Sequence, residues 1–160
     1  MLSLSQTTGY AILALSCLDG CGDRWVLAKQ ISDCTAIPLP YLSKVLCALG
    51  DSGLIEAKRG YRGGFRLARP ADQISLLDVT EAVEGESWLP RCLLGLNECT
   101  DCCDCPTHKF WSKKRKEIEQ ELHRQTLRSV AEFERGRGTH LNGCGCSGET
   151  RARPGRSTGI

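Results

Sequence analysis

The sequence of 160 residues has few aromatic side chains and no long apolar run. Only 6% of its residues are Phe, Trp or Tyr and 41% are hydrophobic, so the chain can bury one modest core but no large internal cavity. The lack of any run of about eighteen apolar residues excludes a membrane-spanning helix. The N-terminus also lacks the basic and apolar segments of a secretory signal. We therefore predict one cytoplasmic domain with appendages and no membrane contact.

Cysteine, by contrast, is abundant. The chain has 11 cysteines, and in a reducing compartment clustered cysteines more often bind metals or carry out redox chemistry than form disulfides. One short segment, directly before a predicted helix, holds Cys92, Cys99, Cys102, Cys103, Cys105 and His108. A set of free surface thiols, the alternative, does not account for this density. We predict a metal site in this segment.

The spacing of these residues is compatible with two kinds of metal site. Cys99, Cys102, Cys105 and His108 recur at every third position, which suits a tetrahedral zinc site. The same cysteines, followed by Pro106, are also similar to part of the bacterial ferredoxin pattern for iron–sulfur clusters. Thiolates bind both metals, and the N-terminus of the following helix favours their negative charge. Spacing alone does not decide between zinc and a cluster.

Charge is small in total but unevenly distributed. The net charge is +2, yet residues 58–69 hold five basic and no acidic side chains, whereas residues 70–105 hold one basic and eight acidic ones. The basic segment has the pattern of two short strands joined by the glycine-rich turn 60–64. We expect Arg59, Arg62 and Arg66 to point from this hairpin towards phosphates or into a minor groove. A hairpin whose charges only aid solubility is the alternative.

The segment before the hairpin predicts three helices. The first is expected from Leu4 to about Leu18, a short one follows around 27–33, and a third runs from Pro38 or Pro40 to Gly50. The last two form a helix-turn-helix pattern, and the hairpin after them is then a wing. The third helix would be the recognition helix, with its outer face in the major groove and the wing arginines on the backbone or minor groove. The DNA-binding residues predicted in this way are Tyr41, Ser43, Lys44, Arg59 and Arg62.

The second half of the chain predicts two more helices and a tail. Ser75 and Asp78 have the spacing of a capping box, which opens a helix to about Glu84. A long helix is expected from Thr107 to roughly Glu134, about 42 Å in length. Its narrow apolar stripe consists of Trp111, Ile118, Leu122, Val130 and Phe133. A small domain cannot cover such a stripe, so we predict pairing with the same helix of a second chain; a monomer with the helix folded back is the alternative.

Residues 136–160 contain seven glycines and almost no aliphatic side chains. This composition predicts a disordered tail. Cys144 and Cys146 lie in it, and we assign them no site.

Taken in order, these motifs resemble the IscR/NsrR (Rrf-two) family of bacterial winged helix-turn-helix iron–sulfur regulators. The resemblance covers residues 1 to about 135. The matching stretches are residues 4–15, Pro40-Tyr41-Leu42-Ser43-Lys44-Val45-Leu46, Gly53-Leu54-Ile55, Arg59-Gly60-Tyr61-Arg62-Gly63-Gly64-Phe65, and Cys92, Cys99 and Cys105. It implies a homodimeric transcriptional regulator, not an enzyme, whose affinity for a palindromic operator in double-stranded DNA is controlled by an iron–sulfur cluster. Iron supply, redox state or nitric oxide would be the signal.

The resemblance also implies a set of cluster ligands. The three family cysteines fall on Cys92, Cys99 and Cys105. The fourth ligand of the IscR type is a histidine, which falls on His108, whereas the acidic ligand of the NsrR type falls on Thr8. This favours a [2Fe-2S] cluster over a [4Fe-4S] cluster. Cys102 and Cys103 are additional, and either could replace His108, with Cys102 as the preferred alternative.

The predicted fold class is mainly α with a small β-hairpin wing. We expect a winged helix-turn-helix domain over residues 1–87, a cluster-binding loop over 88–106, a dimerisation helix over 107–135 and the tail over 136–160. Two other functions stay open. One is a zinc-stabilised DNA-binding protein without a sensing role. The other is a redox enzyme that uses the adjacent Cys102 and Cys103, although the sequence has no nucleotide-binding glycine loop and no Ser/His/Asp arrangement to support it.

Overall fold

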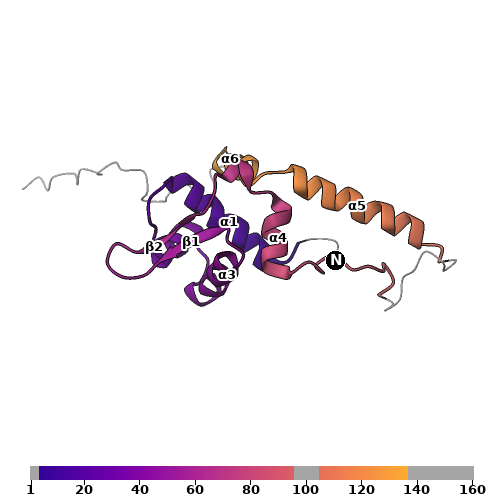
Figure 1. Ribbon diagram of the computed structural model, residues 1–160, viewed down its shortest axis with the longest axis horizontal. Coiled ribbons are helices and arrows are strands. Elements are labelled where there is room, and N and C mark those ends of the chain that lie inside the picture. Colours follow the sequence, from indigo (N-terminus) through magenta and orange to yellow (C-terminus); the bar gives the residue numbers. More distant parts are fainter. Residues whose placement is uncertain (1–3, 96–104, 137–160) are drawn as a thin grey trace, which may run out of the picture.

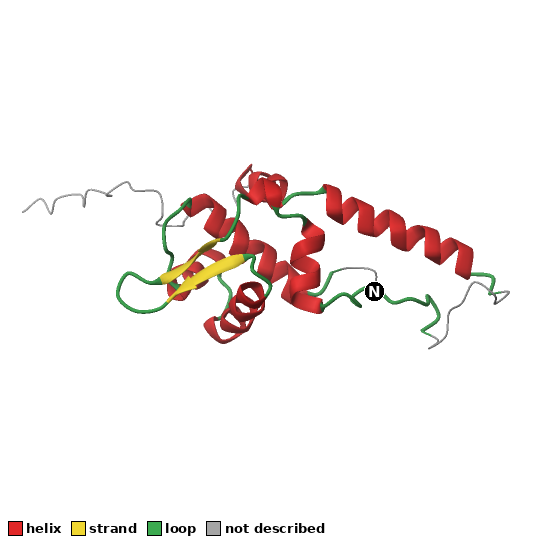
Figure 2. Ribbon diagram, viewed as in Figure 1, coloured by secondary structure: helices red, strands yellow, loops and turns green. Residues whose placement is uncertain are grey.

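The computed structural model describes residues 4–95 and 105–136 (Figures 1 and 2). These residues form six α-helices, one short 3-10 helix and one β-hairpin, so the predicted fold class, mainly α with a β-hairpin wing, is confirmed. The elements in chain order are α1 (Gln6–Cys21), α2 (Ala28–Thr35), α3 (Leu39–Asp51), β1 (Ile55–Lys58), β2 (Gly64–Leu67), η1 (Ala71–Gln73), α4 (Leu76–Glu84), α5 (His108–Arg124) and α6 (Leu127–Gly136).

Helix α1 is the centre of the molecule, and α2, α3, α4 and α6 pack around it (Figure 1). These helices and the hairpin, without α5, make up the body of the domain. It begins at Ser5, whose hydroxyl accepts a hydrogen bond from the backbone N–H of Thr8 at 3.2 Å. It runs to Cys21, three residues past its predicted end, because Gly20 stays helical and the turn falls at Gly22, with a φ of +59°. Its side chains that are buried in the core are Ala11, Ala14, Leu15, Cys17, Leu18 and Cys21.

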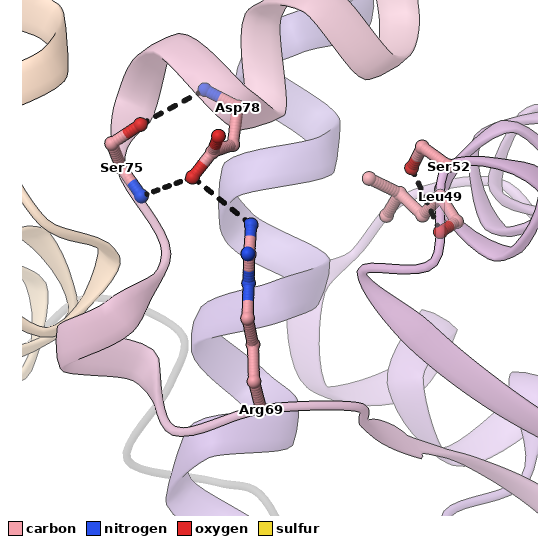
Figure 3. Close-up of polar contacts among 5 residues, drawn as sticks. All are labelled: Leu49, Ser52, Arg69, Ser75 and Asp78. Atoms are coloured by element: carbon pink, nitrogen blue, oxygen red, sulfur yellow. Dashed lines mark hydrogen bonds and ion pairs between the residues drawn. The ribbon is translucent and has the colours of Figure 1, made fainter.

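Helix α4 starts with the predicted capping box, which is confirmed (Figure 3). The N–H of Asp78 donates to the Ser75 hydroxyl at 3.0 Å, and the N–H of Ser75 donates to the Asp78 carboxylate at 2.9 Å. Arg69 adds an ion pair to the same carboxylate at 3.0 Å. The start of α4 is therefore fixed to the segment that leaves β2.

Helix α3 buries the apolar face that its sequence predicts, consisting of Leu42, Val45, Leu46 and Leu49. At its C-terminal end the Ser52 hydroxyl donates to the Leu49 carbonyl at 3.0 Å (Figure 3). Gly53, with a φ of +73°, then turns the chain into β1. The orientation of the hairpin relative to α3 follows from this short connection.

The prediction of one helix from Thr107 to Glu134 is wrong, because the chain leaves the helical conformation at Gln125 and Thr126. The Leu76 N–H donates to the Gln125 carbonyl at 2.9 Å, and the Leu127 N–H donates to the Ile74 carbonyl at 2.8 Å. This short extended pairing precedes α4 on one side and separates α5 from α6 on the other. Helix α6 then returns to α1 instead of continuing outward.

The predicted apolar stripe is accordingly only partly right. Trp111 is buried, but Phe133 is 58% exposed, whereas Leu127 and Ala131 of α6 are fully buried against the core. The carboxylate of Asp19, at the end of α1, is almost fully buried and pairs with Arg128 at 3.4 Å and with Arg135 at 3.2 Å. Cations near the C-terminal end of a helix are favourable, so these contacts attach α6 to α1.

The core position of α6 can be tested with one leucine. Leu127→Ala should lower the free energy of unfolding by about 2–5 kcal/mol, because it removes a fully buried side chain. Leu94→Ala is the matched control, because Leu94 is 57% exposed, and it should change the free energy by less than about 0.5 kcal/mol. Urea-induced unfolding measures both. Equal, small effects would mean that α6 does not belong to the core.

Candidate nucleic-acid interface and cysteine loop

The three predicted DNA-binding residues of α3 lie on the face of the helix that is opposite the core. Tyr41 is 61% exposed, and Ser43 and Lys44 are exposed as well. The Ser43 hydroxyl donates to the Leu39 carbonyl at 2.9 Å, one helical turn back. The outer face of α3 therefore offers an aromatic ring, a hydroxyl and one cation to a partner.

The hairpin is fixed firmly to the body of the domain. Its two strands pair antiparallel, and Phe65 also pairs with Val26, with N···O distances of 2.9 and 2.8 Å. A Cβ atom at Gly64 would lie 2.5 Å from the Val26 carbonyl oxygen, and one at Gly63 would lie 2.2 Å from the Lys58 carbonyl oxygen. Only glycine allows these close approaches, so Gly63 permits the tight turn at the tip and Gly64 permits β2 to lie against Val26.

Four of the five basic side chains of residues 58–69 fall into two groups, and the fifth, Lys58, has its Nζ 5.8 Å from the centroid of the Trp25 ring. Arg66 pairs with Glu56 at 2.7 Å and stacks on the Trp25 ring, 4.6 Å from its centroid. Arg69 pairs with Asp78. The strand register places Arg66 opposite Glu56, so its charge is already partly paired in the folded chain, and its contact with a nucleic acid stays a prediction.

Arg59 and Arg62 make up the second group, at the tip of the hairpin. Within the described residues neither has an acidic partner. The Arg62 guanidinium lies 5.5 Å from the centroid of the Tyr61 ring, and this ring is 91% exposed. The positive charge that remains available is therefore concentrated at the wing tip.

The cysteine loop, residues 88–106, lies within the described part of the chain at its two ends only. Cys92 is buried with 5% exposure, Cys105 is half-buried, and His108 is the first residue of α5. Cys99, Cys102 and Cys103 lie outside the described residues, as do Cys144 and Cys146 and the predicted tail from residue 137 on. In the part of the chain that is described, no three metal-binding side chains come together.

The pKa of the Cys105 thiol is lowered by hydrogen bonds from its neighbours. Hydrogen bonds from the hydroxyl and the N–H of Thr107 lower its pKa, burial opposes this effect, and the N–H of His108 adds to the lowering. The Thr107 hydroxyl lies 3.3 Å from the sulfur. A lowered pKa favours the thiolate, which is the form that binds metals.

Trp111 connects the N-terminal part of the cysteine loop to α5. Its indole N–H donates to the Pro90 carbonyl at 2.9 Å, and its side chain is 3% exposed. The loop that carries Cys92 is thereby held against the helix that begins at His108. In the sequence, Trp111 is recognisable only as part of an apolar stripe, because nothing in its spacing indicates a bond to a loop carbonyl.

Glu84 connects the end of α4, the helix before the loop, to α1. It is the last residue of α4, and its carboxylate accepts hydrogen bonds from the buried Thr8 hydroxyl and, at 3.3 Å, from the N–H of Ser5. Burial raises the pKa of Glu84, but the hydrogen bonds from Thr8 and Ser5 outweigh it, so the pKa lies below its usual value. Thr8, the position of the NsrR-type acidic ligand, here binds a carboxylate of its own chain.

Most of the chain is similar to known proteins. The family model described as "Rrf2: Iron-dependent Transcriptional regulator" matches residues 4–132. An HTH-type transcriptional regulator of Aquifex aeolicus is 31% identical over 132 residues, which cover 81% of this chain and 92% of that protein. The regulator IscR of Cereibacter sphaeroides is 40% identical over 86 residues, or 52% of this chain and 56% of that protein.

Among solved structures, T. potens IscR superposes with a TM-score of 0.65 and 27% identity, covering 82% of this chain and 88% of that one. No helix within the described residues is both long and apolar enough to cross a membrane.

The contact between Glu84 and α1 predicts a dependence of stability on pH. Because the pKa of Glu84 is lowered in the folded state, its charge stabilises the fold above the ordinary pKa of 4.5, and this contribution is lost as the pH falls through the lowered value. Glu84→Gln should cost less than about 1 kcal/mol at neutral pH, because the group is largely exposed to solvent. The difference from wild type should shrink below pH 4.5.

Urea-induced unfolding at a series of pH values measures this difference. Glu81→Gln, at another exposed position of α4, is the control and should give a difference from wild type that does not vary with pH. The same constant difference in Glu84→Gln would contradict the role of the Glu84 charge.

Proposed function

Since this chain belongs to the Rrf2 family of winged-helix transcriptional regulators, which are DNA-binding proteins and not enzymes, we propose that it senses its signal through an iron–sulfur cluster in the cysteine loop. The observation that carries this proposal is the hydrogen bond that attaches the loop to α5. Trp111 of α5 donates to Pro90, two residues before Cys92, while Glu84 attaches the end of the preceding helix α4 to α1. A change in the loop would therefore act on α5, the helix that projects from the rest of the domain.

The DNA would be bound by α3 and the wing. Tyr41, Ser43 and Lys44 are exposed on α3, and Arg59 and Arg62 at the wing tip have no acidic partner within the described residues. In this arrangement α3 enters the major groove while the wing tip contacts phosphates or the minor groove. The wing would then contribute mainly to affinity, and α3 would determine sequence specificity.

We infer a homodimer that pairs through α5. This helix projects away from the body (Figure 1), and Phe110 near its start is 59% exposed. Residues 109–116 hold five basic and no acidic side chains, whereas residues 117–121 hold three glutamates and no basic ones. Contacts within the helix, such as Lys114 to Glu117 at 2.6 Å, use part of this charge. An antiparallel partner would add further pairs and, by two-fold symmetry, would match a palindromic operator with half-sites about 34 Å apart.

The ligands of the cluster would be Cys92, Cys99, Cys105 and His108, with Cys102 as the alternative to the histidine. The chemistry of the described donors fits, because two thiols and an imidazole suit iron and the lowered pKa of Cys105 favours its thiolate. Three cysteines and one histidine favour a [2Fe-2S] cluster over a [4Fe-4S] cluster. Such a cluster supplies sensitivity to iron supply, redox state or nitric oxide when it is bound.

The residues of the chain would convert the state of the loop into a change of DNA affinity. Pro90 is bonded to Trp111 of α5, so a displaced loop changes the position of α5 relative to the body. In a dimer paired through α5, that displacement alters the spacing of the two copies of α3. The dimer would then have two conformations that differ in the spacing of the two α3 helices, and the state of the cluster would shift the equilibrium between them.

The zinc alternative predicts a different purified protein. Purification without oxygen, followed by a visible spectrum and by analysis of iron, sulfide and zinc, distinguishes an iron–sulfur cluster from a zinc site. A coloured protein with iron and sulfide supports the cluster, whereas a colourless one with stoichiometric zinc would overturn the sensing proposal and favour a zinc-stabilised DNA-binding protein.

The role of the wing can be tested through salt. Arg59→Ala and Arg62→Ala should each weaken DNA binding and lower the slope of log affinity against log salt by about one, because each removes one phosphate contact. Arg66→Ala is the matched control on the same hairpin, and it should change the slope less because Glu56 already pairs with Arg66. Unchanged slopes in both tip variants would remove the wing from the interface.

The ligand set can be tested by substitution and reconstitution without oxygen. Cys92→Ala, Cys99→Ala and Cys105→Ala should each abolish cluster binding, whereas Cys103→Ala should hardly change it, because adjacent side chains rarely converge on one metal. His108→Ala should leave a labile cluster with an altered spectrum. Iron and sulfide per chain are the measurement. Full, stable occupancy in Cys92→Ala would move the site to the run from Cys99 to Cys105.

A further inference from the structure

Tyr61 and Arg62 form the apex of the hairpin. The N–H of Gly63 donates to the Gly60 carbonyl at 2.9 Å, so the two residues between them are the central residues of a β-turn. Central turn residues are the part of a hairpin that lies farthest from its paired strands. Tyr61 is accordingly 91% exposed, more than any other large apolar side chain of the described residues. The wing therefore ends in an aromatic ring and a guanidinium.

The side chains of these two residues are in contact with each other. The Arg62 guanidinium lies 5.5 Å from the centroid of the Tyr61 ring, within the range of a cation–π interaction. Lys58 and Arg66 lie over the ring of Trp25 instead, so their charge is held at the base of the hairpin. The cation at the apex thus has its own aromatic partner, and the pair is displayed to the surroundings as a unit.

The chemistry of this pair matches the minor groove of DNA at A·T pairs. The groove is about 6 Å wide, and its floor carries acceptor atoms at A·T pairs, whereas guanine adds an amino group there. A guanidinium donates hydrogen bonds and therefore pairs with acceptors, and narrow A·T-rich grooves attract arginine most strongly. The guanine amino group would meet the ring and repel the donors of Arg62.

We propose that Tyr61, with Arg62 on its ring, enters the minor groove and makes the wing select A·T pairs where it docks. This inference rests on the proposed contact between the wing and DNA. It adds the residue that gives this contact a sequence preference.

The charge around the apex favours DNA over a protein as its partner. Residues 57–71 contain five basic and no acidic side chains, and Arg59 and Arg62 have no acidic partner within the described residues. An exposed ring that is surrounded by positive charge suits a polyanion, and the chain belongs to a family of DNA-binding regulators.

The test starts from a binding site selected out of a randomised duplex library. The full chain is used in two forms, as purified without oxygen and after removal of its metal with a chelator. Each adenine of the selected site is then replaced by diaminopurine, which adds an amino group in the minor groove and leaves the major groove unchanged. Wild type should bind at least about fivefold more weakly when the replaced pair is one that the wing contacts, the lower end of the cost of one mismatched pair.

A reciprocal replacement at the same pairs isolates the amino group. A G·C pair placed there should weaken binding, and an inosine·cytosine pair, which has the same major-groove edge but no amino group in the minor groove, should restore it.

The variants assign the effect to the ring. Tyr61→Ala should bind the selected site more weakly and should no longer distinguish adenine from diaminopurine, while the slope of log affinity against log salt stays unchanged because no charge is removed. Tyr61→Phe is the matched control, because it keeps the ring and should keep both the affinity and the discrimination. Urea-induced unfolding of Tyr61→Ala should match wild type, since the side chain is exposed.

Two results overturn the inference while the wing stays in the interface. One is wild-type binding that tolerates diaminopurine at every adenine of the selected site. The other is Tyr61→Ala with wild-type discrimination; if its affinity for DNA is also that of wild type, the ring serves a protein partner instead. Unchanged salt slopes in both Arg59→Ala and Arg62→Ala would remove the wing from the interface, and a selection that enriches no site would show that no sequence is preferred. Either would overturn the proposed reading of DNA together with this inference.

Discussion

The pairing of residues 125–127 with residues 74–76 determines how the described parts of the chain are arranged. Two backbone hydrogen bonds, from Leu76 to Gln125 and from Leu127 to Ile74, hold residues 125–127 in an extended conformation. Helix α5 therefore ends at Arg124, beside the first residues of α4. Because α5 ends there, it can leave the body at an angle while α6 turns back onto α1 (Figure 1). A continuous helix would have carried Leu127 and Ala131 away from the core and left the Asp19 carboxylate without Arg128 and Arg135.

The same arrangement gives the cysteine loop two fixed ends. The loop follows α4, whose last residue Glu84 is bonded to the first turn of α1, and it meets α5 where Trp111 binds Pro90. Helix α1 in turn packs against α2, α3 and α4, so the loop and the outer face of α3 share one rigid support. The cysteine loop and α3 are thus connected through packed helices and not through a flexible linker.

Local signals in the sequence were sufficient to predict much of this fold. The periodicity of α3, the capping box of Ser75 and Asp78, and the glycine turn of the hairpin each depend on neighbours within a few residues, and all were predicted. The end of α5 was not, because Gln125 and Thr126 include neither proline nor glycine and their extended conformation results from a partner about fifty residues away. For the site, exposure of Tyr41, Ser43 and Lys44 followed from the helical pattern, whereas the pairing of Arg66 with Glu56 required the strand register. Hydrogen bonds such as those of Trp111 and Glu84 join segments that sequence spacing does not relate.

The geometry of the hairpin tip also limits how such a protein can change during evolution. Gly63 and Gly64 have no room for a side chain, and Arg62 has a φ of +58°, which disfavours bulky and β-branched replacements. Arg59 and Tyr61 are the tip residues without these restrictions, and Tyr61 is also the most exposed of the large apolar side chains described. Substitutions at the tip are therefore tolerated best at these two positions, where they alter the surface of the wing without moving its backbone.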